Sequence, residues 1–493
     1  MALKLAVLIG QKKITHVEMQ RNVRDSVDWL RSVSLRSGAW VGVALQNDYQ
    51  HWVITLALLR LGYPCASIYD IKGVPQSLRD RFAHWIVDTP LDTESDWIQP
   101  PQSLWQSQNV KHEVSASVSS YDKSVDGFQL QLGAGAKRLI LTSGTTGLPK
   151  VVGFNAELIQ SRLKASSVNY AKEFNASTRF LSFMGLDTVS GFFYDVLTWM
   201  KGGVVLFGEP TADGRGRTAF PISVSNVITA APARLQELVK QSKGAWPGLD
   251  QRVVLSAGSR LHSSVRDQVQ KIIGSRVINT YGSTEAGSVA ICNAQLLDEH
   301  PGAAGYLPPG VQVEIVASDG TVLPHGKVGR LRCKTPGMAQ GYEGEERSAQ
   351  FEDGWFYPGD LAVLRADGWL IVTGRNTDVI NLGGKKLSAV EMESRLQNLD
   401  NVEDVCVMNV DIRGKESLAV AVVCPLDADR SALRQQVVDA LGRVGPLHLV
   451  FMDRLPRNAM GKLPRQAIAQ HLSKTLTDRA NPRSNDVASG KAA

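Results

Sequence analysis

The sequence predicts an α/β protein in which a large N-terminal domain is followed by a small α+β domain. Helix and strand patterns alternate near the N-terminus, short strands alternate with turns over residues 311–369, and mixed helices and strands return after Gly374. The chain has 493 residues, which at roughly 150 residues per domain corresponds to about three structural units. We therefore expect a large domain of several subdomains over residues 1–374, a small domain over residues 375–473 and a disordered tail over residues 474–493.

Each expected element follows from the spacing of its apolar residues. Apolar positions three or four residues apart predict helices at residues 18–33, 52–61, 390–399 and 433–441. Short apolar runs bounded by turn residues predict strands at residues 40–45, 138–141, 151–154, 252–255, 276–278, 405–408 and 418–423. Asp-Gly turns separate further short strands between residues 311 and 369, which predicts the β-rich portion, and the polar stretch of residues 99–135 is typical of a surface connection.

Composition and charge argue against several classes of protein. The net charge is +6, but 54 basic against 48 acidic residues is a mild excess without a dense basic block, so we expect no nucleic-acid partner. No apolar run approaches the ~20 residues that span a bilayer, and no signal-peptide pattern occurs, so we expect no membrane partner and a cytoplasmic location. The five cysteines lack C-x-x-C spacing, which argues against a disulfide framework and a zinc site.

The segment from Thr142 to Lys150 has the composition of a phosphate-binding loop. It reads Thr-Ser-Gly-Thr-Thr-Gly-Leu-Pro-Lys and lies between two expected strands. Its glycines allow the backbone to approach a ligand, while hydroxyls, backbone N–H groups and the lysine can surround phosphate oxygens. Pro149 and the missing G-K-[ST] ending exclude a Walker A loop. The alternative is an exposed flexible turn, which the preceding buried strand and the Pro-Lys ending make less favourable.

This loop resembles the T-S-G-T-T-G-x-P-K-G motif of the acyl-adenylate-forming superfamily. That superfamily includes acyl- and aryl-CoA synthetases, the adenylation domains of peptide synthetases, and luciferase. Val151 stands where the family usually has glycine. Further segments resemble the remaining family motifs in order, at residues 280–285, 354–360, 374–375 and 456–463. Five ordered matches make chance similarity a poor explanation, although each motif alone has a false-positive risk.

The segment Thr280-Tyr281-Gly282-Ser283-Thr284-Glu285 resembles the family's aromatic-G-x-T-E motif. The resemblance implies that Tyr281 stacks on adenine, that Thr284 contacts the α-phosphate and that Glu285 helps to hold Mg²⁺. An aromatic face suits a purine, and a hard divalent cation prefers carboxylate oxygen. The alternative is a capping loop in which Ser, Thr and Glu satisfy the start of a helix.

Three later residues receive roles from the same resemblance. The segment of residues 354–360 is similar to G-W-x-x-T-G-D, with Pro358 in place of Thr, which implies that Asp360 binds both ribose hydroxyls. Arg375 corresponds to the family arginine that contacts ribose and phosphate and marks the domain boundary. Lys462, in a segment similar to P-x-x-x-x-G-K-[ILV], corresponds to the lysine that approaches the reacting carboxylate. The alternatives are a turn aspartate and solvated surface charges.

The resemblance as a whole implies a set of site residues and ligands. The catalytic residues would be Lys462, Glu285 and Thr145, with Glu285 as the metal ligand. The ATP-binding residues would be Thr142, Ser143, Gly144, Thr145, Thr146, Gly147, Lys150, Gly258, Thr280, Tyr281, Thr284, Asp360, Arg375 and Lys462. The ligands would be ATP, Mg²⁺ and coenzyme A, or phosphopantetheine on an acyl or peptidyl carrier protein.

The family reaction has two steps, so the resemblance implies a mobile small domain. A carboxylate first attacks the α-phosphorus of ATP to give acyl-AMP, and a thiol then attacks the acyl-AMP. Rotation of the small domain about a hinge, at Thr377 or Asp378, would exchange Lys462 for a thiol tunnel lined by Gly383 and Gly384.

Two alignments with the family motif leave the identity of the substrate open. The substrate pocket would include Gly282, Ser283 and either Thr188 as a gate or Asp187 as the partner of a substrate amine. We favour a coenzyme A ligase for a small aryl or acyl acid, with a stand-alone enzyme that loads an amino acid or acyl group onto a carrier protein as the alternative. A non-catalytic nucleotide-binding scaffold is a minor alternative, because the charged motif residues are all present.

Overall fold

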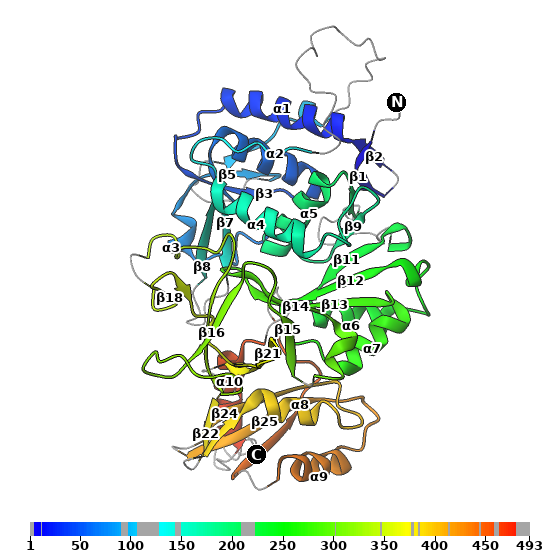
Figure 1. Ribbon diagram of the computed structural model, residues 1–493, viewed down its shortest axis with the longest axis vertical. Helices are drawn as coiled ribbons and strands as arrows, with labels where there is room; N and C mark the ends of the chain where they lie inside the picture. Colours follow the sequence, from blue (N-terminus) through cyan, green and yellow to red (C-terminus); the bar gives the residue numbers. More distant parts are fainter. Residues whose placement is uncertain are drawn as a thin grey trace, which may run out of the picture.

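The domains follow one another along the long axis of the molecule. Figure 1 shows the N-terminal α/β layers at one end, the β-rich portion in the middle and the small C-terminal domain at the other end. The computed structural model describes residues 4–10, 12–89, 97–105, 128–142, 149–208, 222–300, 302–345, 348–375, 379–382, 385–412, 415–442, 445–457 and 463–479.

The first sheet is mostly parallel, which is typical of the alternating helix and strand pattern near the N-terminus. Its strand order is β6-β5-β3-β4-β7-β8, and only β7 and β8 are antiparallel neighbours. The strands are β3 (Trp40–Ala44), β4 (Pro64–Ser67), β5 (Phe82–Val87), β6 (Trp97–Ile98), β7 (Lys137–Thr142) and β8 (Lys150–Asn155). The helices and turns of this region are α1 (His16–Ser32), α2 (Asp48–Leu61), α3 (Gln76–Arg79) and η1 (Gln102–Leu104).

Local sequence signals set the ends of the first two helices. Thr15 and Glu18 form a capping box at the start of α1, in which each side chain accepts a hydrogen bond from the backbone N–H of the other residue. Helix α2 ends at Gly62, whose φ of 89° is in the left-handed region that favours glycine. Because nearly all of α2 is buried, it forms the centre of the N-terminal core rather than an outer layer.

The largest sheet in the described residues has 15 strands and changes character at the Tyr281 segment. Its order is β18-β19-β17-β20-β21-β15-β14-β13-β12-β11-β9-β10-β1-β2, with β16 on β17. From β13 through β12, β11, β9 and β10 to β1 the neighbours are parallel, whereas from β13 through β14 to β18 they are antiparallel. The predicted β-rich portion is therefore the antiparallel half of this sheet.

The bounds of its elements are as follows. The strands are β1 (Leu5–Ile9), β2 (Lys12–Thr15), β9 (Arg179–Ser182), β10 (Val204–Phe207), β11 (Val227–Ala230), β12 (Val253–Ala257), β13 (Arg276–Ser283), β14 (Gly287–Asn293), β15 (Ala303–Tyr306), β16 (Gln312–Val316), β17 (Gly329–Lys334), β18 (Phe351–Glu352), β19 (Trp355–Phe356), β20 (Asp360–Leu364) and β21 (Trp369–Arg375). The helices and turns are α4 (Ala156–Asn169), α5 (Val189–Met200), α6 (Pro232–Gln241), α7 (Ser263–Ile272), η2 (Ile222–Val224), η3 (Leu249–Gln251) and η4 (Ala294–Leu297).

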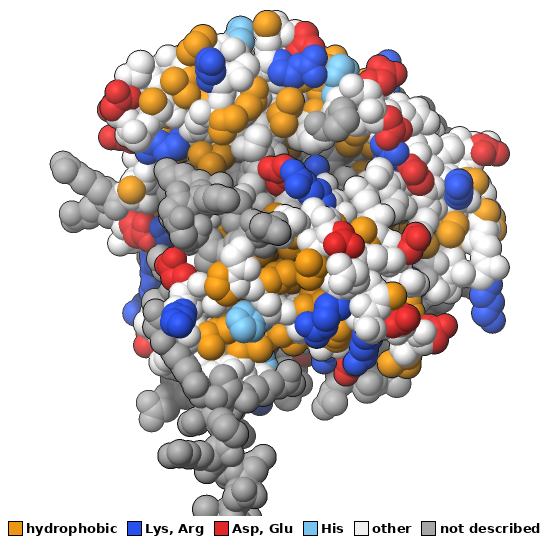
Figure 2. All heavy atoms as spheres, turned by 90° about the horizontal axis from the view of Figure 1, so that it is seen from below, with side chains coloured by type: hydrophobic (Ala, Val, Ile, Leu, Met, Phe, Trp, Pro, Cys, Tyr) orange, Lys and Arg blue, Asp and Glu red, His pale blue; other side chains and the backbone are white. Residues whose placement is uncertain are grey.

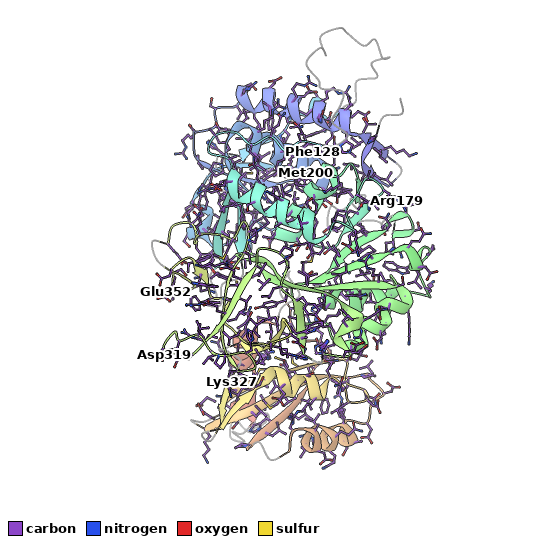
Figure 3. The ribbon with its side chains drawn as sticks, viewed as in Figure 1. Phe128, Arg179, Met200, Asp319, Lys327 and Glu352 are labelled. Atoms are coloured by element: carbon purple, nitrogen blue, oxygen red, sulfur yellow. The ribbon has the colours of Figure 1, made fainter. Side chains whose placement is uncertain are left out.

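Helix α5 joins the two sheets through its aromatic residues. Trp199 packs edge-on against Trp52 of α2, with ring centroids 4.9 Å apart, and its indole N–H donates to the backbone oxygen of Ala6. Phe128 packs on Trp199 from the side, near Met200 at the end of the helix (Figure 3). The N-terminal layers therefore share one core.

The small domain combines a sheet with three helices. Its order is β24-β25-β26, and β22 and β23 form a separate hairpin. The elements are β22 (Val379–Leu382), β23 (Lys385–Ser388), α8 (Ala389–Leu396), β24 (Asp404–Ile412), β25 (Lys415–Val423), α9 (Arg430–Leu441), β26 (Leu447–Phe451) and α10 (Arg465–Arg479). Seen from this end, basic, acidic and hydrophobic side chains are interspersed on the surface (Figure 2).

Polar contacts connect the small domain to α6. Lys240 Nζ lies 2.6 Å from Glu403 Oε2, and Gln236 donates to the backbone oxygen of Glu403. Next to the domain boundary, the Ser388 hydroxyl donates to the backbone oxygen of Thr373. Of these three contacts, the one between Lys240 and Glu403 is exposed and the other two are partly buried. Polar contacts of this kind suit a domain that can change its orientation.

One predicted boundary, the start of the C-terminal tail, is wrong. The expected tail from residue 474 begins too early, because α10 continues to Arg479 and packs Leu472 and Leu476 on the small-domain core. Residues 480–493 lie outside the described part of the chain. No helix among the described residues is both long and apolar enough to cross a membrane.

Candidate active site

Two antiparallel strands carry the predicted phosphate loop, as the sequence indicates. Thr142 at the end of β7 pairs with Lys150 at the start of β8. The loop residues Ser143, Gly144, Thr145, Thr146 and Gly147 lie outside the described residues, and their roles stay predictions.

Lys150 faces the segment that contains Glu285. Its ammonium lies 4.2 Å from the centre of the Tyr342 ring and 3.5 Å from Glu345 Oε2. The Tyr342 hydroxyl in turn donates to Glu285 Oε1 at 2.9 Å. Burial and the Glu285 charge raise the pKa of Tyr342, which keeps its proton and its role as a donor. The structure therefore brings together two predicted site residues, Lys150 and Glu285, through a tyrosine that the sequence analysis missed.

Arg162 of α4 holds the backbone of the Thr284–Glu285 segment. Its two Nη groups donate to the backbone oxygens of Thr284 and Glu285, at 2.9 and 2.8 Å. The guanidinium lies over the Phe154 and Phe193 rings and is buried. Burial lowers its pKa to about 9, which still leaves it protonated at neutral pH. A buried, charged fork of this kind fixes the segment from which the Glu285 side chain projects.

Tyr281, Asp360 and Arg375 meet at the end of β13, although 79 residues separate the first two. The Tyr281 hydroxyl donates to Asp360 Oδ2, and Arg375 Nε lies 3.2 Å from Asp360 Oδ1. Asp360 and Arg375 are also direct neighbours across β20 and β21. Burial and the Asp360 charge raise the pKa of Tyr281. The three residues predicted to bind the nucleoside therefore form one hydrogen-bonded group.

The remaining residues of the motif line the hairpin of β13 and β14. Gly282 pairs with Ser288, and a side chain at Gly282 would lie 1.9 Å from the backbone oxygen of Gly287, so only glycine fits there. The Ser283 hydroxyl accepts from the Ala286 N–H and shapes the turn. Gly258, in the loop after β12, has a φ of 98°.

Thr188 and Asp187 have partners within the protein. Thr188 caps α5: its hydroxyl accepts from the Gly191 N–H and donates to the backbone oxygen of Gly185. Asp187 lies near the fully buried Arg138, which donates to Leu186 O and Ser67 Oγ. Burial lowers the pKa of Arg138, whereas the charge of the Asp187 carboxylate raises it. The Asp187 charge therefore has a cation close by without a substrate amine.

Several predicted residues cannot be placed. Lys462, Gly383, Gly384, Thr377 and Asp378 lie outside the described residues, so the catalytic lysine, the thiol tunnel and the hinge stay predictions.

Sequence reasoning also missed residues that support the site. Arg162 lies between Ile159 and Leu163, and only the structure shows that these positions are buried and that its charge therefore needs a buried partner. For Tyr342 the only hint is an aromatic residue within a Gly-rich segment.

The donor set fits Mg²⁺ bound together with phosphate groups. Glu285 is a buried carboxylate, and Mg²⁺ is commonly held by one or two carboxylates together with substrate phosphates. Within the described ranges no group of three His, Cys, Asp or Glu residues could hold a metal ion. The arrangement can thus bind a nucleoside through Asp360, place phosphates between Lys150 and Glu285, and leave the opposite face of the hairpin to a second substrate.

Comparison with known proteins decides the family. The model of the AMP-binding enzyme family matches residues 3–343, and that of the AMP-binding enzyme C-terminal domain matches residues 391–462. The chain belongs to the AMP-binding enzyme family. This AMP-binding enzyme is similar to o-succinylbenzoate CoA synthetase from Bacillus subtilis, with a TM-score of 0.77 and 21% identity over 94% of this chain and 95% of that one. The predicted α/β fold with a large and a small domain is therefore confirmed.

Two curated relatives are CoA ligases. The 4-chlorobenzoate–CoA ligase of Arthrobacter sp. is 26% identical over 95% of this chain and 92% of its own length. The medium-chain fatty-acid–CoA ligase of Escherichia coli (strain K12) is 28% identical over 69% of this chain. The match covers 62% of that ligase and 61% of a probable CoA ligase from Humulus lupulus, so the AMP-binding enzyme spans under two thirds of these two relatives.

Proposed function

We propose that this protein is an AMP-forming acid–thiol ligase that converts a small carboxylic acid first into acyl-AMP and then into a thioester of coenzyme A. The observation that carries the proposal is the group formed by Tyr281, Asp360 and Arg375, beside the Glu285 segment. The Asp360 carboxylate lies at one edge of the hairpin, and a carboxylate acceptor of this kind suits ribose hydroxyls. The relatives that are CoA ligases support the same chemistry.

In the first step a carboxylate oxygen of the acid attacks the α-phosphorus of ATP, and the bond to pyrophosphate breaks. Both reactants are anions, so Lys150, Lys462 and the donors of the 142–150 loop neutralise charge as they approach. Glu285 would hold Mg²⁺, which supplies further charge neutralisation at the phosphates when bound. Asp360 fixes the ribose, and Arg162 fixes the Glu285 segment.

In the second step the thiol of coenzyme A attacks the carbonyl carbon of acyl-AMP, its proton is lost and AMP leaves. Rotation of the small domain about Thr377 or Asp378 would bring Gly383 and Gly384 to the site in place of Lys462. The exposed contact between Lys240 and Glu403 would break in this rotation, at a small cost, because such pairs contribute about 0–1 kcal/mol.

The substrate that we propose is an aryl or acyl acid without an α-amine. The position of Asp187 near Arg138 supports this choice, because a guanidinium already lies close enough to interact with the carboxylate. Loading of a carrier protein in place of free coenzyme A is the alternative acceptor. The cytoplasmic location expected from the sequence stays a prediction.

The test is ATP–pyrophosphate exchange with a panel of benzoate-like, fatty and amino acids, followed by addition of coenzyme A or a carrier protein. Lys462→Ala should lower exchange by about 10²–10³-fold, since one preorganised cationic donor is lost, while thioester formation from supplied acyl-AMP survives. Equal loss of both half-reactions would contradict the role of Lys462. Absence of exchange with every acid would overturn the ligase assignment.

A further inference from the structure

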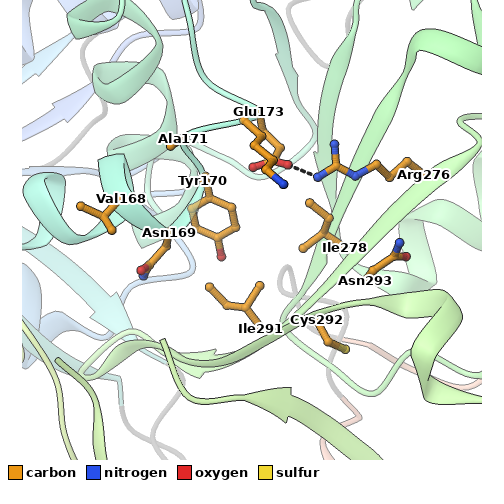
Figure 4. Close-up of a pocket in the computed structure, with 11 residues that line it drawn as sticks. Val168, Asn169, Tyr170, Ala171, Glu173, Arg276, Ile278, Ile291, Cys292 and Asn293 are labelled. Carbon is orange, nitrogen blue, oxygen red and sulfur yellow. Dashed lines mark hydrogen bonds and ion pairs between the residues drawn. The ribbon is translucent and has the colours of Figure 1, made fainter. Parts of the chain in front are cut away.

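Two glutamates are buried in the part of the chain that the structure describes, and their carboxylates have different partners. Glu173 lines a pocket of about 600 Å³ and forms an ion pair with Arg276 (Figure 4). Glu285 forms no ion pair with a described residue, and its Oε1 accepts from the neutral Tyr342 hydroxyl. Arg162 is close enough for its charge to act on Glu285, but both of its Nη groups donate to backbone oxygens. Because buried charges in proteins are paired or bind metal ions, the Glu285 carboxylate is suited to bind a cation.

The Tyr342 hydroxyl contacts one of the two carboxylate oxygens of Glu285. Its oxygen lies 2.9 Å from Oε1, and no described residue forms a hydrogen bond with Oε2. The hydroxyl also lies 2.8 Å from Gln350 Oε1, but it carries a single hydrogen, and a charged carboxylate is a stronger acceptor than a neutral amide. The hydrogen bond therefore fixes the rotation of the carboxylate group and leaves Oε2 available to a cation.

The position of Tyr342 is itself fixed by its neighbours. Its ring packs edge-on against Phe351, with ring centroids 5.3 Å apart. The backbone N–H of Glu343 donates to the backbone oxygen of Val151 on β8 at 2.8 Å. The ammonium of Lys150, the preceding residue of β8, lies 4.2 Å from the centre of the Tyr342 ring. Tyr342 is therefore held between β8 and the segment that carries the buried carboxylate.

From this geometry we infer that Tyr342 is a positioning residue, which orients Glu285 so that Oε2 is the oxygen available to the Mg²⁺ that binds with ATP. The inference rests on the proposed function, from which it takes the metal-binding role of Glu285. Tyr342 acts through Glu285 and is not a metal ligand, because its hydroxyl is bonded to the carboxylate. The loss of a hydrogen bond that orients a metal ligand typically costs about 10–100-fold in metal affinity or activity.

The experiment measures the binding of ATP to the full chain by titration calorimetry, once with excess Mg²⁺ and once with EDTA. The dissociation constant in EDTA divided by that in Mg²⁺ gives the contribution of the metal ion to binding. Tyr342→Phe keeps the ring beneath Lys150 and loses only the hydroxyl. It should therefore lower this ratio by about three- to tenfold and leave the dissociation constant of metal-free ATP unchanged.

Two further variants show whether Tyr342 acts through Glu285. Glu285→Gln is the reference, because it removes the negative charge that attracts the metal ion. In the double variant of Glu285→Gln and Tyr342→Phe, the ratio should equal that of Glu285→Gln alone, since two residues that act as one unit are not additive. Tyr49→Phe is the matched control, because Tyr49 is also buried and its hydroxyl accepts from Asn22 on α1. It should keep the wild-type ratio.

The outcomes separate this inference from the proposed function. An unchanged ratio in Tyr342→Phe would overturn the inference and leave the ligase assignment intact. A further loss in the double variant, beyond that of Glu285→Gln, would also overturn it, because Tyr342 would then act independently of Glu285. If the wild type binds ATP neither with nor without Mg²⁺ and no acid supports pyrophosphate exchange, both the inference and the proposed function are wrong.

Discussion

Replacing Arg162 with methionine should destabilise the large domain by about 2–4 kcal/mol. The variant loses two charged hydrogen bonds, to the backbone oxygens of Thr284 and Glu285. A buried acceptor that loses its donor costs about 1–3 kcal/mol. The backbone oxygen of Glu285 still accepts from the Ala339 N–H at 2.9 Å, so its contribution to the destabilisation is at the lower end of that range. The methionine side chain retains much of the packing between the Phe154 and Phe193 rings.

The same change should impair adenylation more than folding alone explains. The Glu285 carboxylate projects from the segment that Arg162 fixes, and a displacement of about 1 Å in a catalytic group costs up to about 10²-fold in rate. We expect kcat/KM for ATP–pyrophosphate exchange to fall 10–100-fold and the Mg²⁺ concentration needed for half-maximal exchange to rise. Arg162→Lys should recover little of this loss, because an ammonium cannot donate to both oxygens with the same geometry.

The assay combines urea unfolding, followed by tryptophan fluorescence, with Mg²⁺ titrations of the exchange reaction under native conditions. The control is Arg31→Met, at an exposed arginine paired with Asp28 on α1, where such pairs contribute about 0–1 kcal/mol. Arg162→Met with an unchanged unfolding midpoint and an unchanged Mg²⁺ requirement would refute the reasoning. A lower unfolding midpoint with an unchanged Mg²⁺ requirement would show that Arg162 has a structural role alone.

Three further changes test other parts of the site. Asp360→Ala should weaken ATP binding and slow adenylation, because the ribose loses its acceptor, and an unchanged ATP titration would remove Asp360 from the site. Asp187→Asn should lower stability, because the buried Arg138 loses a nearby negative charge, and selective loss of amino-acid exchange would instead support amine binding. Burial and Arg260 lower the pKa of His262 to about 4, so below pH 6.5 the unfolded chain takes up a proton that the folded protein does not. Stability should therefore fall between about pH 6.5 and 4, and unfolding of His262→Gln should be less sensitive to acid over that range, whereas equal sensitivity would exclude His262 as a cause.

Elements whose structure depends on residues close together in the chain could be predicted from the sequence. The loop between Thr142 and Lys150 is closed by two strands, as its flanking apolar runs indicate. The β-rich portion and the small domain follow from the same strand and helix patterns. The meeting of Tyr281, Asp360 and Arg375 required the family resemblance, because no local signal connects residues on β13, β20 and β21.

Helices α4 and α5 lack a clear helical pattern in the sequence, for two opposite reasons. Helix α5 is buried on nearly all sides, so its apolar residues show no polar face and no helical period. Helix α4 is mostly polar and buries only Ile159, Arg162 and Leu163, which is too few positions for a recognisable stripe. Contacts such as that between Tyr342 and Glu285, which are 57 residues apart, depend on the tertiary fold and cannot be read from spacing.

The N-terminal strands protect one end of the large sheet from aggregation. Strand β1 covers the apolar strand β10, and β2 forms the outermost edge with the exposed Lys12 and Lys13. An uncovered edge strand presents unpaired N–H and C=O groups to other chains, and lysines on such a strand discourage pairing with them. Removing residues 1–15 would therefore leave β10 as an unpaired edge strand and promote self-association through it.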